Sequence, residues 1–197
     1  MPTTNSAYGT GDKNNFCDEN SPLNPISSYA KEKVEVEKIL LNHENSISFR
    51  LATVFGFSPR MRIDLLVNDF TYRAVKDKYI VLFESKFKRN YIHVRDVSLA
   101  FLHAINNFES MKNQIFNVGL SDANISKFEL CKMIQNFIPD LVIFEEQFKK
   151  DEDQRNYIVS NAKIESSGFK PKYTLNQGIL ELIKGYKMLK SYSHGNV

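Results

Sequence analysis

Short apolar segments that read as buried strands alternate with longer amphipathic segments, and this alternation limits the possible folds more than any other feature of the chain. Residues 47–55 form the clearest apolar strand, and they follow a helical stretch at residues 27–42. Residues 63–76 return to helical periodicity through Leu66 and Phe70. Because strands that alternate with helices favour parallel pairing, the sequence predicts an α/β fold built on parallel strands.

The rest of the chain continues the same alternation. Ser27 or Ser28 is expected to cap the first helix. Asp96 is expected to cap a helix at residues 97–108. A stretch rich in Asn, Asp and Pro at residues 12–25 predicts a surface loop. The remaining predictions are helices at residues 126–137 and 176–189, and strands at residues 79–83, 91–94, 115–118 and 141–144.

Composition excludes several classes of function. Of the 197 residues, 42% are hydrophobic and 25% are charged, which is ordinary for a globular protein. The net charge of +3 is small and the basic residues are scattered, so neither nucleic acid nor a membrane surface is an expected partner. No apolar run approaches the roughly 20 residues that span a bilayer.

Cysteine and histidine usage gives no sign of a metal site. Cys17 and Cys131 stand alone, without metal-ligand spacing, which is typical of a protein in a reducing compartment. His93 has no partner at metal spacing and is expected in the core or behind the site residues. Since no signal peptide is recognisable either, we expect a cytoplasmic location and no metal.

Tyr29 and Lys33 stand four residues apart near the start of the first predicted helix. Residues at this spacing share one helix face, so the ammonium group can lie close to the phenol. A nearby cation favours the phenolate, which makes the pair suitable for acid/base chemistry on alcohols and ketones. Tyr and Lys also occur at this spacing by chance on solvated helices, so the pattern alone leaves both interpretations open.

The residues around this pair resemble the extended short-chain dehydrogenase/reductase family, in its nucleotide-sugar epimerase/dehydratase branch, and are most similar to UDP-glucose 4-epimerase-like members. Six blocks match the family in order, including a Thr-Asn-Ser-Ala-Tyr-Gly segment and an Arg-Asn-Tyr-Ile-His-Val-Arg-Asp segment. They lie at residues 2–9, 25–33, 50–56, 89–97, 116–119 and 153–171.

The resemblance implies a partial Rossmann-like, doubly wound parallel sheet with a smaller α/β substrate-binding lobe. Residues 1–56 would carry the C-terminal part of the dinucleotide-binding domain, including the Tyr29 helix. Residues 57–197 would form mainly the substrate-binding lobe, with elements that thread back to the sheet. Family members are often homodimers.

A Gly-rich turn between the first strand and the first helix normally holds the cofactor pyrophosphate in this fold. No G-x-x-G-x-x-G motif occurs in this sequence, and Met1 precedes residues that resemble the end of the family's mid-sheet strand. We therefore expect the chain to lack the N-terminal half, to be inactive alone, and to need a separate N-terminal Rossmann half as a partner.

The resemblance also assigns catalytic and cofactor roles. Thr4, five residues before Gly9, matches the catalytic hydroxyl that positions the sugar, and Tyr29 and Lys33 match the acid/base pair. Tyr29 and Lys33 would also contact the nicotinamide of NAD or NADP, together with backbone at Ala52 and Val54. The family's commoner Phe-Asn-Val is Ala-Thr-Val here, so its usual asparagine contact is not expected.

The two residues that directly follow Thr4 limit the type of reaction that this site can catalyse. Dehydratases of the family carry an Asp-Glu pair where this chain has Asn5 and Ser6. Without a carboxyl pair, removal of a hydroxyl group lacks its acid and base. Decarboxylases usually carry a Glu here as well, so epimerisation or ketone reduction remains.

The expected substrate is a nucleotide diphosphate sugar. Arg89 matches the family arginine that binds the diphosphate, a task that suits a guanidinium fork. Arg60 and Arg62 lie where the family's substrate loop begins, and Arg155 is a further candidate phosphate ligand, although a surface position explains Arg60 and Arg155 equally well. Asn68 is a candidate contact to the nucleotide, although an exposed turn of helix explains it equally well.

Three functions stay open at this stage. An epimerase would regenerate its nicotinamide at every turnover, whereas a reductase of the same family would consume it. A non-catalytic binding module, or a truncated product that needs an N-terminal partner, is the third. These residues do not specify which sugar or which nucleotide the substrate carries, or whether the cofactor is NAD or NADP.

Overall fold

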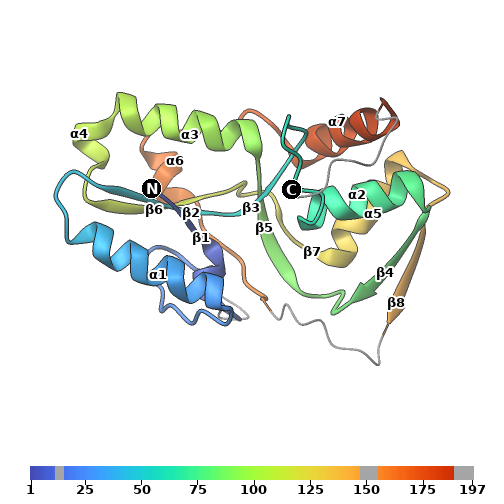
Figure 1. Ribbon diagram of the computed structural model, residues 1–197, viewed down its shortest axis with the longest axis horizontal. Helices are drawn as coiled ribbons and strands as arrows, with labels where there is room; N and C mark the ends of the chain where they lie inside the picture. Colours follow the sequence, from blue (N-terminus) through green and yellow to red (C-terminus); the bar gives the residue numbers. More distant parts are fainter. Residues whose placement is uncertain (12–15, 147–154, 189–197) are drawn as a thin grey trace.

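The computed structural model describes residues 1–11, 16–146 and 155–188. Its first sheet has three parallel strands in the order β1 (Pro2–Thr4), β2 (Ile47–Leu51) and β6 (Gln114–Val118). β6 therefore returns to the sheet after a long excursion through the other lobe (Figure 1). This is the α/β architecture with parallel strands that the sequence predicts.

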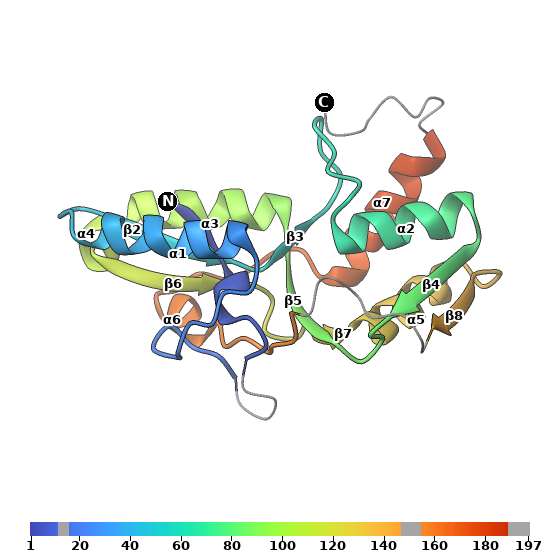
Figure 2. The same ribbon diagram turned by 60° about the horizontal axis from the view of Figure 1, so that its bottom comes forward.

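The remaining strands form a second three-stranded sheet, in the order β3 (Thr53–Phe55), β5 (Lys88–His93) and β7 (Asn124–Ser126), and a two-stranded sheet of β4 (Tyr79–Phe83) and β8 (Val142–Glu146). β3 pairs in parallel with β5, and β4 pairs in parallel with β8. β7 pairs antiparallel with β5, which departs from the expected all-parallel pattern. As Figure 2 shows, β5 runs from the first lobe toward β7 and the second lobe.

The helices gather at the two ends of the molecule. Around the first sheet lie η1, a 3-10 helix (Asn5–Tyr8), α1 (Ser28–Leu41), α3 (Val94–Asn106), α4 (Phe108–Met111) and α6 (Ala162–Ser166) (Figure 1). Around β4, β7 and β8 lie α2 (Leu66–Lys76), α5 (Lys127–Phe137) and α7 (Leu175–Met188) (Figure 2). One continuous apolar core joins the two ends, because buried side chains of β2, β5, α2 and α7 belong to the same cluster.

Most predicted elements are confirmed to within a few residues, but the expected strand at residues 47–55 is wrong as a single strand. It breaks at Ala52, whose N–H donates to the Val118 carbonyl at 2.9 Å. After that bond the chain leaves β6, and β3 pairs with β5 in the second sheet. Both halves are apolar because both are buried, so hydrophobicity alone gave no sign of the break.

The expected Asp96 cap is also wrong. α3 begins at Val94, and the His93 Nδ1 caps it by accepting from the Arg95 N–H at 3.2 Å. Asp96 is buried in the first turn, where its carboxylate accepts the backbone N–H groups of Lys172 and Tyr173 at 2.8 and 3.0 Å. It therefore fixes the segment that leads into α7. Of the sequence predictions, residues 12–15, 153–154 and 189 lie outside the described residues.

Candidate active site

A cavity of about 800 Å³ opens at the carboxyl end of β1, between the first sheet and the second lobe. Thr4, Ser6, Tyr29 and Lys33 line one side. Backbone segment 51–54 lines another, and Arg62, Arg89, Lys127 and Arg155 add cations from the rest of the chain. Ligands of open α/β sheets bind at the carboxyl ends of the strands, and this cavity lies at such an end.

Thr4 is the last residue of β1 and the N-cap of η1. Its backbone is still extended (φ −149°, ψ 140°), while its Oγ1 accepts the Ser6 N–H at 3.1 Å. A threonine suits both tasks, since β-branched residues favour strands and its hydroxyl caps a helix. The hydroxyl is thereby held at the cavity wall, and Thr4 is buried.

Tyr29 and Lys33 lie in the first two turns of α1, whose Ser27 cap accepts the Ala30 N–H at 3.2 Å. The Tyr29 side chain opens into the cavity, and the residue is 54% exposed. Lys33 Nζ lies 5.9 Å from the centroid of the Tyr29 ring and donates to the Pro2 carbonyl at 3.3 Å. The helix therefore brings both side chains to the cavity, next to the strand that ends at Thr4.

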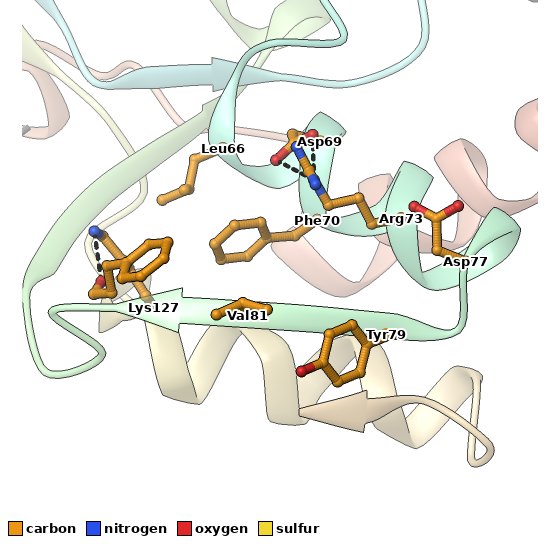
Figure 3. A pocket seen from close by; sticks show the side chains of 9 residues that line it. Leu66, Asp69, Phe70, Arg73, Asp77, Tyr79, Val81 and Lys127 are labelled. Atoms are coloured by element: carbon orange, nitrogen blue, oxygen red, sulfur yellow. Dashed lines mark hydrogen bonds and ion pairs between the residues drawn. The ribbon is translucent and has the colours of Figure 1, made fainter. Parts of the chain in front are cut away.

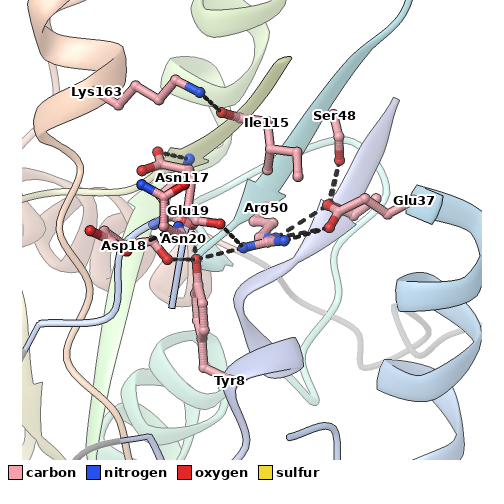
Figure 4. Close-up of polar contacts among 11 residues, drawn as sticks. Tyr8, Asp18, Glu19, Asn20, Glu37, Ser48, Arg50, Ile115, Asn117 and Lys163 are labelled. Carbon is pink, nitrogen blue, oxygen red and sulfur yellow. Dashed lines mark hydrogen bonds and ion pairs between the residues drawn. The ribbon is translucent and has the colours of Figure 1, made fainter. Parts of the chain in front are cut away.

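A buried carboxylate one turn further along α1 holds this helix in place, and sequence analysis missed it. Glu37 accepts from Arg50 Nη2 on β2 at 2.6 Å, from Ser48 Oγ at 2.7 Å and from Thr3 Oγ1 at 3.1 Å (Figure 4). Tyr29, Lys33 and Glu37 follow each other at four-residue spacing, so they form one stripe on α1. The stripe is anchored at Glu37 and open to the cavity at Tyr29.

The opposite end of the Arg50 guanidinium reaches η1. Arg50 Nη1 donates to the Tyr8 hydroxyl at 3.0 Å, and that hydroxyl donates to Asn117 Oδ1 on β6 at 2.7 Å (Figure 4). Burial raises the pKa of Tyr8 to about 12, despite the neighbouring Arg50. Tyr8 is thus a neutral hydrogen-bonding group that fixes η1 against the sheet, rather than a second acid/base residue.

The segment from Leu51 to Val54 forms a wall of the cavity. Ala52 is buried, and Thr53 and Val54 of β3 lie in parallel register with Tyr91 and Ile92 of β5. Ala52 and Val54 therefore line the same cavity as Tyr29 and Lys33.

Two arginines reach the cavity from distant parts of the sequence. Arg89 is only 2% exposed; its Nη1 donates to the Lys88 carbonyl at 3.1 Å and its guanidinium lies 5.7 Å from the Tyr157 ring centroid. Arg155 Nη1 donates to Ser6 Oγ at 2.5 Å. Lys127, which sequence analysis also missed, is buried beside them and donates to the Phe83 carbonyl at 3.0 Å. Arg89 and Arg155 lie 66 positions apart in the sequence, so only the fold brings them together.

The loop before α2 places the other predicted substrate residues differently. Arg62 lines the cavity and pairs with Asp64 at 2.6 Å. Arg60 is exposed on this loop, outside the described residues that line the cavity. Asn68 is buried rather than on an exposed turn: its amide accepts from the Gly56 N–H at 3.1 Å and donates to the Arg62 carbonyl at 2.9 Å. Asn68 therefore fixes the loop, and it is not among the described lining residues.

A smaller cavity of about 480 Å³ continues from the first one between α2 and β4 (Figure 3). The two cavities share Leu66, Asp69 and Lys127. Burial raises the pKa of Asp69 above its ordinary value, although the Arg73 guanidinium at 2.8 Å opposes this effect.

His93 is buried in the core, as expected, and Nε2 pairs with Glu181 Oε2 at 2.8 Å. Within the described ranges, no cluster of three or more His, Cys, Asp or Glu side chains is arranged to hold a metal ion. None of the helices in those ranges has both the length and the apolar character needed to cross a membrane.

Residues 2–119 match the model of the NAD dependent epimerase/dehydratase family. This match covers more than half of the 197 residues, so the chain belongs to that family. It is 27% identical to an uncharacterised protein of Schizosaccharomyces pombe, over 93% of this chain and 60% of that protein. It is also 27% identical to a putative UDP-glucose 4-epimerase of Methanocaldococcus jannaschii, over 86% of this chain and 56% of that protein.

The fold agrees with that membership. A solved UDP-glucose 4-epimerase of Thermotoga maritima, in complex with UDP-glucose, superposes with a TM-score of 0.80 at 24% identity, over 94% of this chain and 62% of that one. The chain spans between 54% and 60% of the length of the curated relatives it matches. The resemblance to an epimerase/dehydratase is thereby confirmed at the level of family and fold.

Proposed function

We propose that this chain carries the catalytic and substrate-binding part of an NAD(P)-dependent nucleotide-sugar epimerase. One observation carries the proposal: a hydroxyl, a phenol and an ammonium group (Thr4, Tyr29, Lys33) share one cavity with two arginines (Arg89, Arg155). The first group suits proton transfer at a sugar carbinol, and the second suits a diphosphate. The epimerase among the relatives and the structure with UDP-glucose support the same substrate class.

The residues present fit the nicotinamide-ribose end of a dinucleotide cofactor. Lys33 has three N–H donors, and among the described residues the Pro2 carbonyl is its one hydrogen-bond acceptor. Donors therefore remain for ribose hydroxyls beside Tyr29, while the wall at Ala52 and Val54 offers backbone to a flat ring. When bound, a nicotinamide cofactor supplies the group that takes up and returns a hydride.

The chain's own part in the reaction is to position the sugar and to move one proton. Thr4 Oγ1 lies at the cavity wall, where it can hydrogen-bond the oxygen of the reacting carbinol. Tyr29 accepts the carbinol proton when the carbon is oxidised and returns it when the carbon is reduced. The ammonium of Lys33 lies 5.9 Å from the centroid of the Tyr29 ring, so a positive charge lies beside the phenol that exchanges this proton.

Elimination of water is not supported. Asn5 is buried and Ser6 is a neutral hydroxyl, so the positions after Thr4 bring no carboxyl group to the cavity. The carboxylates that do line it, Asp64 and Asp69, are each paired with an arginine. A ketone reductase remains the second candidate, because it would use the same Thr4, Tyr29 and Lys33.

A requirement for a separate dinucleotide-binding half is the remaining alternative. This sequence contains no G-x-x-G-x-x-G turn, and β1 pairs with β2 alone among the described strands. An unpaired strand edge favours association with another strand. A cytoplasmic location and a homodimer, as in many family members, belong to the same proposal.

Calorimetric titration with UDP-glucose tests the substrate class. If Arg89 holds the diphosphate, Arg89→Ala weakens binding by about 2 kcal/mol or more, because a charge-assisted pair of hydrogen bonds is lost. Arg60→Ala is the matched control, since Arg60 is an exposed arginine outside the described lining. Equal affinities of the wild-type protein and Arg89→Ala would contradict the assignment, and so would an absence of binding by the wild-type protein.

A further inference from the structure

Ser6 lies at the centre of a chain of hydrogen bonds that joins the two halves of the proposed site. Its Oγ accepts from Thr4 Oγ1 at 3.1 Å and from Arg155 Nη1 at 2.5 Å. Thr4 is the proposed carbinol contact, and Arg155 is a proposed diphosphate ligand. Ser6 lines the cavity between them and is only 3% exposed.

The Ser6 hydroxyl has one hydrogen-bond donor for which the described residues provide no acceptor. A serine oxygen accepts two hydrogen bonds and donates one. Thr4 and Arg155 fill both acceptor positions of Ser6, and no acceptor for its hydrogen occurs among the described residues. Buried polar groups are rarely left unpaired, so an acceptor from outside this chain is expected to meet this hydrogen in the cavity.

The Ser6 side chain is not needed for local structure. The N-cap of η1 is Thr4, whose Oγ1 accepts the Ser6 backbone N–H, and the Gly9 N–H closes the turn onto the Ser6 carbonyl at 3.2 Å. Both bonds use the Ser6 backbone, so alanine would preserve them. The backbone hydrogen bonds of η1 therefore do not require the Ser6 hydroxyl.

We propose that Ser6 donates its hydroxyl hydrogen to an oxygen of the bound pyranose. This inference rests on the proposed function, since it takes a nucleotide sugar as the ligand. A hydroxyl next to both Thr4 and Arg155 lies between the reacting carbinol and the diphosphate. Ser6 is thus a ligand-positioning residue for the sugar part of the substrate.

Titration of two probes, UDP-glucose and UDP, separates this contact from the diphosphate contact. Ser6→Ala is expected to weaken UDP-glucose binding about five- to tenfold, the loss of one ordinary hydrogen bond, and to leave UDP binding unchanged. Ser6→Thr keeps the hydroxyl and is expected to retain most of the UDP-glucose affinity. Ser98→Ala on α3 is the matched control, because the Ser98 hydroxyl bonds the Val94 carbonyl of its own helix at 3.4 Å, away from the residues that line the cavity.

The outcomes separate this inference from the proposed function. If the wild-type protein binds neither probe, the proposed function fails. If it binds both, and Ser6→Ala leaves UDP-glucose unchanged or weakens both probes equally, the sugar contact is overturned. Retained UDP binding by Ser6→Ala also shows that the variant is folded, so a selective loss of UDP-glucose binding supports the inference.

Discussion

At the scale of single residues, the candidate site depends on side chains whose neighbours differ sharply. Tyr29 is more than half exposed and open to the cavity, whereas Tyr8 is buried and fixed by Arg50 and Asn117. The two tyrosines, which belong to different matched blocks, therefore have different roles. Of the two, Tyr29 is the one that has both access to the cavity and a nearby ammonium group, Lys33, as proton transfer requires.

Replacing Tyr29 with phenylalanine tests this role. In a protein completed by a dinucleotide-binding N-terminal half, Tyr29→Phe should lower turnover about a hundredfold or more, because the proton carrier is lost while the ring is kept. Steady-state rates with UDP-glucose measure the effect. Cofactor affinity should change little, and a variant with full turnover would exclude Tyr29 as the proton carrier.

At the scale of elements, α1 is joined to the sheet by one ion pair. The Glu37 and Arg50 side chains are 5% and 4% exposed, and Glu37 also accepts from Thr3 and Ser48. A hydrophobic contact would hold the helix less specifically, since it has no preferred direction. The carboxylate, with donors from three side chains, instead fixes the rotation of α1, and with it the position of Tyr29 and Lys33 above Thr4.

Removing this charge should destabilise the protein strongly. Glu37→Gln leaves the buried Arg50 guanidinium without its counter-charge, so we expect a loss of about 3 kcal/mol in the free energy of unfolding. Urea denaturation measures it. Glu35→Gln is the control on the same helix, because Glu35 is 65% exposed and its pair with Lys38 contributes less than about 1 kcal/mol. Similar losses in both variants would contradict the anchoring role.

A second element-scale prediction concerns α5 and pH. Glu129 accepts the Ser126 N–H at 2.7 Å in a capping box, and this bond holds the pKa of Glu129 below its ordinary value. A lowered carboxyl pKa adds stability above the pKa of the unfolded chain, and that stability is lost as pH falls through the folded value. Glu129→Ala should therefore cost about 1 kcal/mol at pH 7 and progressively less below about pH 4. Thermal unfolding across this range measures the difference, and a constant difference would refute it.

At the scale of the whole molecule, the candidate site is assembled at the meeting of two lobes. Thr4 and Tyr29 come from the first lobe, Arg89 from the long strand β5 and Lys127 from α5. β5 belongs to both lobes, since it pairs with β3 at one end and with β7 at the other. A shift of either lobe would separate the proposed proton-transfer residues from the proposed diphosphate residues.

The 197-residue chain is expected to bind NAD too weakly to measure. In this fold a Gly-rich turn supplies most of the affinity for the cofactor pyrophosphate, and this sequence does not contain one. Isothermal titration of the 197-residue chain with NAD, alone and after addition of an N-terminal dinucleotide-binding half, measures this. Binding should appear only with the added half. Saturable micromolar binding by the chain alone would show that the expectation is wrong.

By itself, the sequence determined the elements and the family. Helix α5 is predicted within a residue from its hydrophobic periodicity, and a capping box between Ser126 and Glu129, which is a local interaction, closes its first turn. The match of ordered blocks identified an epimerase/dehydratase, since the motif residues are close together within each block. Local spacing also indicated that Tyr29 and Lys33 share one helix face, because residues four apart are neighbours on a helix.

Only the tertiary structure decided how these parts meet. The break at Ala52, the three-residue strand β7 and the second role of Asp96 all depend on partners more than 30 positions away. From the sequence alone, Glu37 is indistinguishable from a solvent-exposed charge on a helix; only the fold places Arg50 beside it. Ser6 became a candidate ligand contact for the same reason, because Arg155 lies 149 positions along the chain. Long-range pairing of polar groups leaves no periodic signal in a sequence, so it was visible only in the folded molecule.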